Sequence, residues 1–166
     1  DSLGAVHAAA MASVGHTVIG VDVDENKVRA LSNFDAPFFE PGLPELLKKG
    51  QESGNLTFTT DIEQAKDATV HFVCVGTPQR QGEFAADMTY VEAAFESVVT
   101  ILKPGDVVVG KSTVPVGTAA RMEPAVTEHG AVLAWNPEFL REGHAVDDTL
   151  TPNRIIYGLS LIHISE

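Results

Sequence analysis

The sequence has a single cysteine, Cys74, among its 166 residues. A chain with one cysteine forms no internal disulfide, which is typical of proteins kept in a reducing compartment, so we expect a cytoplasmic location. Cys74 stands within the apolar run TVHFVCV at 69–75. We therefore expect it to be buried inside a strand as a small hydrophobic residue, and not to serve as a nucleophile.

Long apolar runs and basic residues are also few. No run approaches the roughly 18 residues that span a bilayer, so we expect no membrane segment. Lysine and arginine number 11 against 23 aspartates and glutamates, which gives a formal net charge of -12. Such an acidic surface repels nucleic-acid backbones and anionic membranes, and it argues against both as partners. The six histidines show no spacing typical of metal ligands, and we predict no metal site.

Short β-branched runs alternate with helical patterns along the chain. We predict strands at 17–22, 56–59, 69–75, 107–110, 132–135 and 154–158. We predict helices at 5–13, 24–32, 44–49, 87–102 and 117–129, the third ended by Gly50. Strands that alternate with helices imply a parallel sheet covered on both faces. The predicted fold class is therefore α/β with a doubly wound parallel sheet, and any other α/β fold is the alternative.

The start of the chain resembles the end of a dinucleotide-binding fingerprint. That fingerprint runs strand, G-x-G-x-x-G turn, helix, strand and then an acidic residue about 20 positions on. Leu3 and Gly4 precede a helix of small residues, and Asp22 ends the next predicted strand, but the first strand and two glycines are absent. A carboxylate there can accept hydrogen bonds from the ribose hydroxyls of NAD and would repel the 2′-phosphate of NADP. We therefore predict NAD bound by a Rossmann-like sheet with its first strand missing, the alternative being that Asp22 is only a capping aspartate at a strand end.

Three further loops follow predicted strands, at the edge where open α/β sheets bind ligands. They have the sequences VGTP at 75–78, KSTVPVGT at 111–118 and NPEFLREG at 136–143. Gly76 allows a close approach of backbone to a cofactor, and Thr77 offers a hydroxyl. Taken alone, the first loop reads equally well as a structural turn, and the hydroxyls of the second as a helix N-cap. Their occurrence on consecutive strand ends favours one shared site.

The third loop carries two carboxylates and a guanidinium within five residues. Glu138 and Glu142 are one helical turn apart, so on a helix both side chains would face the same way. Paired carboxylates in a cleft can carry out acid–base chemistry. The residues by themselves favour the alternative, a solvated helix start.

Together these stretches resemble the UDP-glucose/GDP-mannose dehydrogenase family, and PNRIIYG at 152–158 is similar to the family's P-D-R-I-V-x-G, with Asn153 in place of Asp. The resemblance covers about residues 3–158. It implies an enzyme that oxidises the C6 alcohol of a nucleotide sugar to a carboxylate and consumes two NAD. A cysteine of the second domain would form a thiohemiacetal and then a thioester. UDP-glucose is the favoured substrate, and GDP-mannose or UDP-N-acetylmannosamine are the alternatives.

The resemblance also implies roles for individual residues. Asp22 would bind the adenosine ribose, with Lys27 near the same end of the cofactor. Glu138 would be the acid–base residue of thioester hydrolysis, Thr113 would order water and neighbouring side chains, and Glu142 would contact the nicotinamide end. The other residues implied to bind the cofactor are Leu3, Gly4, Val75, Gly76, Thr77, Pro78, Ser112 and Val114. The residues implied to contact the nucleotide sugar are Glu138, Phe139, Leu140, Arg141 and Glu142.

The chain departs from the family pattern at both ends. The pattern stops at Gly158, so we interpret 1–158 as a truncated NAD-binding domain and LSLIHISE at 159–166 as a non-native tail, whose apolar part (159–164) can fill the vacant central position of the sheet. The domain with the catalytic cysteine is absent, so we expect no activity from the chain alone. The parent is expected to form a homo-oligomer through a region missing here. The alternatives are a non-catalytic NAD-binding module and another NAD-dependent dehydrogenase.

Overall fold

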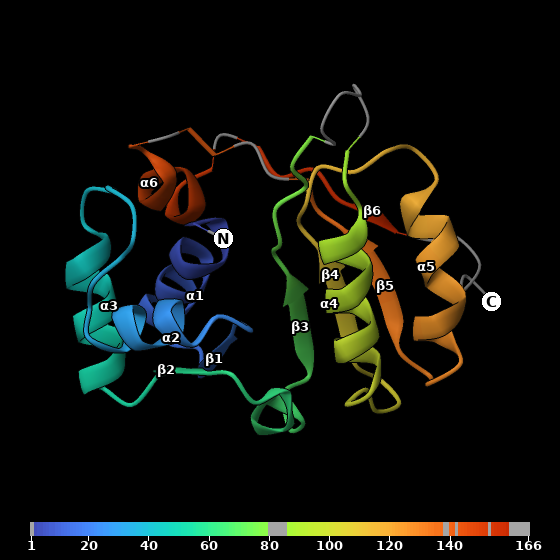
Figure 1. Cartoon of the computed structure of the whole chain (residues 1–166), viewed down its shortest axis with the longest axis horizontal. Helices are drawn as coiled ribbons and strands as arrows, with labels where there is room; N and C mark the ends of the chain where they lie inside the picture. Colours follow the sequence, from blue (N-terminus) through green and yellow to red (C-terminus); the bar gives the residue numbers. More distant parts are fainter. Residues whose placement is uncertain (1, 80–85, 138–139, 142, 153, 160–166) are drawn as a thin grey trace. The chain divides into compact units, whose positions relative to one another are not determined.

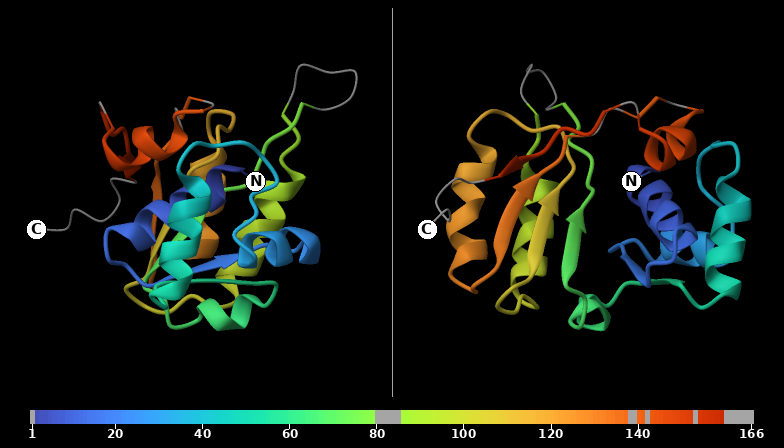
Figure 2. Two further views of the ribbon diagram at one scale, coloured as in Figure 1. Left: turned by 90° about the vertical axis from the view of Figure 1, so that its left-hand side faces the viewer. Right: turned by 180° about the vertical axis from the view of Figure 1, so that it is seen from behind.

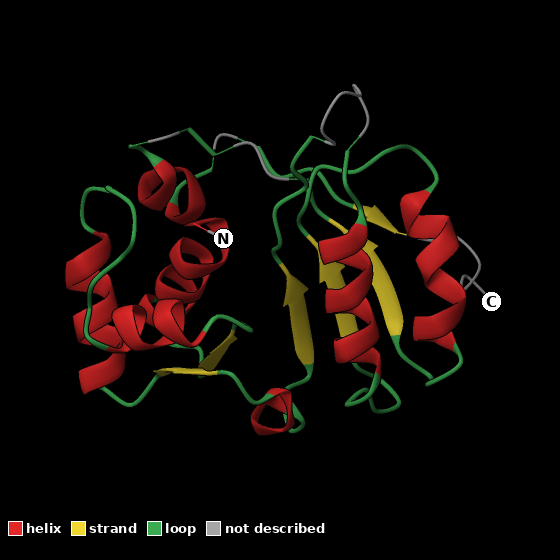
Figure 3. Ribbon diagram, in the orientation of Figure 1, coloured by secondary structure: helices red, strands yellow, loops and turns green. Residues whose placement is uncertain are grey.

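The computed structural model describes residues 2–79, 86–137, 140–141, 143–152 and 154–159 (Figures 1 and 3). The chain forms two compact units. Unit 1 comprises Asp1–Ala65 and Phe139–Arg154, and unit 2 comprises Lys66–Glu138 and Ile155–Glu166. Each unit has its own sheet and its own hydrophobic core, so the α/β class predicted from the alternating pattern is confirmed.

Unit 1 is built on a pair of parallel strands. Its elements are α1 (Ser2–Ser13), β1 (Val18–Val21), α2 (Glu25–Ser32), α3 (Leu43–Glu52), β2 (Leu56–Thr59), the 3-10 helix η1 (Ile62–Ala65) and α6 (Ala145–Leu150). The register of β1 and β2 pairs Val18 with Leu56 and Val21 with Thr59. The alanines of α1 bring it close to its neighbours, and they are buried together with Leu43, Leu47 and Leu56 in the core of the unit.

Helix α3 runs past the glycine that was expected to end it. Gly50 is buried inside α3, and a Cβ atom there would lie 3.0 Å from the Cβ of Leu56 and 3.4 Å from that of Ala12. Glycine therefore lets α3 approach β2 and α1 closely. The prediction of a helix end at Gly50 is wrong, because packing in the core outweighs the weak helix propensity of glycine.

Unit 2 contains a sheet of four strands in the order β3-β4-β5-β6. Its elements are β3 (Val70–Val73), α4 (Thr89–Val99), β4 (Val107–Gly110), α5 (Thr118–Thr127), β5 (Val132–Trp135) and β6 (Gly158–Leu159). The first three strands are parallel, and β6 runs antiparallel to β5 (Figure 2). Helices α4 and α5 share one core with the sheet, centred on Val91, Val108 and Val126.

Each sheet pairs a glycine with an aromatic residue on the neighbouring strand. Gly20 of β1 lies opposite Phe58 of β2, and Gly110 of β4 lies opposite Trp135 of β5. A Cβ atom at Gly20 would meet the Phe58 ring at 2.5 Å, and one at Gly110 would meet the Trp135 ring at 2.6 Å. The aromatic rings therefore lie over the glycines, which no larger residue can replace without a shift.

Three local expectations are wrong. The strand expected at 154–158 is instead the two-residue β6 at Gly158–Leu159, and α6 was not foreseen because its six residues have no long apolar period. Strand β3 ends at Val73, so Cys74 is half-buried in the following loop and not inside a strand. Leu159 pairs with Ala134 of β5 at an outer edge of the unit 2 sheet, and the rest of the apolar tail (160–164) lies outside the described residues.

Among the described residues, no helix is both long and apolar enough to cross a membrane. The other predicted strands and helices are confirmed, with ends that differ from the prediction by a few residues.

Candidate functional site

In unit 1, the candidate cofactor carboxylate stands directly after β1. The Asp22 amide donates to the carbonyl of Thr59 at 3.2 Å, which continues the pairing of β1 with β2. Asp22 Oδ1 accepts from the amide of Asp24 at 3.0 Å, and Oδ2 lies 3.9 Å from Lys27 Nζ. The side chain is 27% exposed. Asp22 is thus held at the carboxyl end of β1 with a cation beside it, as the sequence predicted.

The residue that caps α2 is Asp24. Its Oδ1 atom accepts from the amides of Asn26 at 2.9 Å and Lys27 at 3.4 Å, as expected of an N-cap. Asp22 is therefore not the N-cap of α2, but its bond from the Asp24 amide also fits the alternative interpretation, a capping aspartate at a strand end. Leu3 and Gly4, the other candidates of this unit, lie half-buried in the first turn of α1 and not ahead of it.

In unit 2, the loops after β3 and β4 are joined by hydrogen bonds. The buried Ser112 hydroxyl donates to the carbonyl of Val75 at 2.6 Å and accepts from the Val75 amide at 3.3 Å. Thr77 Oγ1 donates to the carbonyl of Thr113 at 2.9 Å. The N-cap position of α5 is Gly117, so neither Ser112 nor Thr113 caps that helix. The structure therefore brings the VGTP and KSTVPVGT loops together, with Gly76, Pro78 and Thr113 exposed.

A buried lysine, which the sequence analysis did not single out, fixes the start of NPEFLREG. Lys111 is 9% exposed, and its Nζ donates to Asn136 Oδ1 at 2.7 Å. The Asn136 amide donates to the carbonyl of Gly110 at 2.8 Å, and its Nδ2 donates to the carbonyl of Ile156 at 2.6 Å. Trp135 Nε1 also donates to the Ser112 carbonyl at 3.0 Å. The ends of β4 and β5 are thus tied together by side chains.

From position 139 on, NPEFLREG belongs to unit 1. Glu138, Phe139 and Glu142 lie outside the described residues, so their predicted roles stay predictions. Leu140 packs half-buried against the unit 1 core. The Arg141 guanidinium forms two hydrogen bonds to Asp148, from Nη2 at 2.7 Å and from Nε at 3.1 Å. The hydrogen bond from this guanidinium lowers the pKa of Asp148 to about 2.

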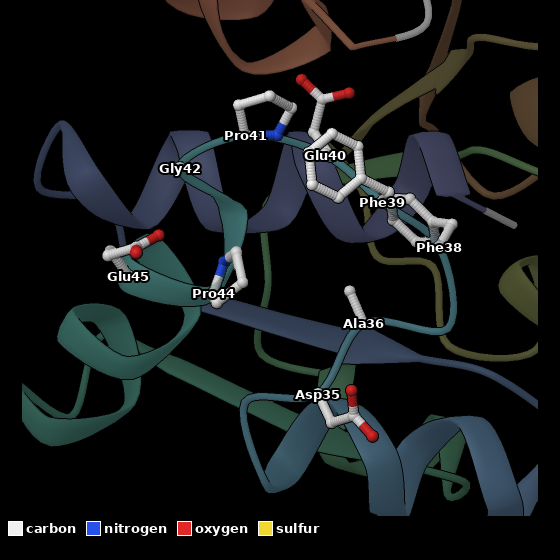
Figure 4. Close-up of a pocket in the computed structure, with 9 residues that line it drawn as sticks. All are labelled: Asp35, Ala36, Phe38, Phe39, Glu40, Pro41, Gly42, Pro44 and Glu45. Atoms are coloured by element: carbon white, nitrogen blue, oxygen red, sulfur yellow. The ribbon is translucent and has the colours of Figure 1, made fainter.

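An open hollow lies in unit 1 between α2 and α3. It is lined by Asp35, Ala36, Phe38, Phe39, Glu40, Pro41, Gly42, Pro44 and Glu45 (Figure 4). Two exposed acidic residues, Asp35 and Glu45, line it together with the buried Glu40. Among the described residues, no group of three histidine, cysteine or acidic side chains could hold a metal ion.

The model of the UDP-glucose/GDP-mannose dehydrogenase family, NAD binding domain, matches residues 2–162. The chain belongs to this family. It is 43% identical over 162 residues to UDP-glucose 6-dehydrogenase of Rhizobium meliloti, an overlap of 95% of this chain and 37% of the relative.

Two solved structures resemble this dehydrogenase domain. The UDP-glucose dehydrogenase of Pyrobaculum islandicum has a TM-score of 0.86 and 40% identity, over 95% of this chain and 38% of that one. A ternary complex of GDP-mannose dehydrogenase from Pseudomonas aeruginosa has a TM-score of 0.88 and 33% identity, over 96% and 39%. The dehydrogenase domain thus spans less than two fifths of the length of these relatives.

NAD is the cofactor of this dehydrogenase domain, and the described residues fit it. Asp22 lies at the carboxyl end of β1, where a carboxylate would accept hydrogen bonds from ribose hydroxyls. Gly76 is exposed in a loop at the carboxyl end of β3, where backbone can approach a ligand.

Proposed function

We propose that this chain is the NAD-binding part of a UDP-glucose 6-dehydrogenase, which oxidises the C6 alcohol of UDP-glucose to the carboxylate of UDP-glucuronate in two hydride transfers. The carboxylate of Asp22, held after β1 and not used as a helix cap, is the observation that carries the choice of NAD. The identity of 43% to a UDP-glucose 6-dehydrogenase supports the choice of sugar. GDP-mannose is the second candidate, because a GDP-mannose dehydrogenase shares the fold at 33% identity.

The residues of this chain would bind and orient the cofactor. Asp22 accepts hydrogen bonds from the adenosine ribose, and Lys27 lies near the same end. Bound NAD supplies the hydride acceptor. Glu142 contacts its nicotinamide end, and Glu138 moves a proton for the water that hydrolyses the thioester. The remaining cofactor contacts come from Leu3, Gly4, Val75, Gly76, Thr77, Pro78, Ser112, Thr113 and Val114.

The nucleotide sugar would contact NPEFLREG through Glu138, Phe139, Leu140, Arg141 and Glu142. The bidentate pair of Arg141 with Asp148 supports a positioning role for this segment, since it fixes the guanidinium. A homo-oligomeric parent and a cytoplasmic location stay predictions.

Calorimetric titration of NAD and NADP tests the cofactor assignment. We expect NAD to bind at least tenfold more tightly than NADP, because the Asp22 carboxylate repels the 2′-phosphate by about 1.4 kcal/mol or more. Asp22→Asn should weaken NAD binding and narrow this preference. Glu25→Gln, at an exposed position of α2, is the matched control. It should change neither the affinity for NAD nor the preference for NAD over NADP.

The titration is run on this chain and on the same chain extended by the family's first strand and glycines. Binding by the extended form alone supports the proposal and shows that the glycine turn supplies the pyrophosphate contacts. Failure of both forms to bind NAD, or equal binding of NADP, would contradict it.

A further inference from the structure

Glu40 is a buried carboxylate that the proposed function does not use. It lies in the loop before α3 and is 6% exposed. Its Oε2 atom accepts from the amide of Gly143 at 3.1 Å, and its Oε1 atom accepts from the amide of Val146 at 3.2 Å. In Figure 4 its carboxylate points away from Asp35 and Glu45. The two partners are 103 and 106 residues further along the chain.

The two bonds do more than cap a helix. Val146 is the second residue of α6, and an acceptor for its amide is ordinary capping. The residue at the N-cap position, His144, makes no such bond with its side chain, so Glu40 replaces it. Gly143, however, precedes the helix and ends NPEFLREG, where its φ of 76° turns the chain sharply. Glu40 therefore also fixes the last residue of the motif.

A second carboxylate, that of Asp148, holds Arg141 of the same motif. The amide of Arg141 donates to Asp148 Oδ2 at 3.0 Å, and the guanidinium binds the same side chain. The backbone amides of Arg141 and Gly143 are thus held by buried or half-buried carboxylates, those of Asp148 and Glu40 respectively.

The hydrogen bonds of Glu40 constrain the direction of the backbone N–H groups, which apolar packing does not. Ala145 and Val146 are buried in the unit 1 core, and their contacts keep α6 against α1. Apolar contacts tolerate small rotations, whereas a carboxylate that accepts two amides sets the direction of both N–H groups. A buried carboxylate is costly unless such donors compensate it, so its presence indicates a positional requirement at this turn.

We propose that Glu40 is a positioning residue that fixes the amides of Gly143 and Val146, and through them the contact of the NPEFLREG segment with the nicotinamide end of NAD. The second half of this proposal rests on the proposed function; the first half rests on the contacts alone.

Amide hydrogen exchange measured by NMR tests the first half. In Glu40→Gln, one oxygen acceptor remains, and we expect exchange to rise by about tenfold at whichever of Gly143 and Val146 loses its acceptor, the loss of one bond to a charged acceptor. Glu40→Ala should raise it further, while amides of α1 and α3 stay protected. Glu45→Gln, an exposed residue of the same hollow, is the control. Unchanged exchange at Gly143 and Val146 in Glu40→Gln would overturn the proposal, even if Glu40→Ala does not fold.

Parallel titrations with NAD and ADP-ribose test the second half, in whichever form of the chain binds NAD. ADP-ribose lacks the nicotinamide, so a positioning role predicts that Glu40→Gln weakens NAD about tenfold and leaves ADP-ribose unchanged. Equal weakening of both ligands, or of neither, contradicts the positioning role. Absence of NAD binding by the unsubstituted protein contradicts the proposed function instead, and the exchange data then still decide whether Glu40 holds the turn.

Discussion

Residue scale: at the edge of unit 2 opposite to the candidate loops, His71 and Asp106 form a buried pair. His71 Nε2 lies 3.1 Å from Asp106 Oδ2, which also accepts from the Lys103 amide at 2.9 Å. Burial raises the pKa of Asp106, but the hydrogen bonds from Lys103 and His71 lower it more, so the pKa lies below its ordinary value of 3.8. The ionised carboxylate is thus favoured in the folded chain.

This pair makes part of the stability depend on pH. Because the folded pKa of Asp106 is depressed, its contribution is present above pH 3.8 and is lost as pH falls from there through the folded pKa. Asp106→Asn should lower the free energy of unfolding by about 1–3 kcal/mol at pH 7 and by less in acid. Urea unfolding at pH 7 and below pH 4 measures this, with the exposed Asp67→Asn as control. An equal loss at both pH values would rule the explanation out.

Single residues at strand ends could be inferred from sequence, whereas residues that act across the chain could not. Asp22 is positioned by the strand that precedes it, so the local pattern suffices. Lys111 and Glu40 look like ordinary surface residues in the sequence. Their partners, Asn136 and Gly143, are 25 and 103 positions away, so only the tertiary fold shows what they do.

Element scale: the end of β4 depends on the glycine beneath Trp135. The Trp135 ring stacks on Phe95 with centroids 5.7 Å apart, and its Nε1 is bound to the Ser112 carbonyl, so the ring has little room to move. A methyl group at Gly110 would meet this ring at 2.6 Å. The packing of β4 on β5 therefore requires glycine at this position.

Gly110→Ala should destabilise the chain by about 1–3 kcal/mol through overpacking. Thermal unfolding measured by circular dichroism should show a lowered Tm. Gly158→Ala is the matched control, because no atom lies within 4 Å of a Cβ atom there, and its Tm should stay close to that of the unsubstituted chain. Equal Tm values for the two variants would show that the Trp135 ring can shift to accommodate a methyl group at position 110.

Elements were predictable where composition alone decides them. The runs 56–59, 107–110 and 132–135 are strands with the predicted ends, because short apolar runs between turns favour a strand over a helix. Helix α6 and strand β6 depend on neighbours instead: α6 on the core around α1 and on Glu40, and β6 on its pairing with β5. Neither carries a periodic signal of its own.

Whole-molecule scale: the chain spans 37% of the UDP-glucose 6-dehydrogenase of Rhizobium meliloti. The cysteine that the proposed mechanism requires is expected in a second domain, since the sole cysteine here, Cys74, follows β3 in unit 2. We expect the isolated chain to form no NADH from UDP-glucose, as followed by absorbance at 340 nm. Steady NADH formation by the isolated chain would refute the assignment of the chemistry to a second domain.

A protein that joins this chain to the second domain of the proposed enzyme serves as the positive control for that measurement. It should form about two NADH per UDP-glucose and prefer this sugar to GDP-mannose and UDP-N-acetylmannosamine, as the proposed two hydride transfers require. A preference for GDP-mannose would select the second candidate substrate and leave the NAD assignment intact.

The division of the chain sets an order of events during synthesis. Unit 2 begins at Lys66, and its parallel strands are complete by Trp135, whereas unit 1 takes up the later segment that contains α6. On the ribosome, Glu40 emerges more than a hundred residues before the amides of Gly143 and Val146. Its carboxylate must stay hydrated until then, because burial without donors is costly. Unit 1 therefore begins first but is completed only after the parallel strands of unit 2, and the amides of Gly143 and Val146 are fixed only at that stage.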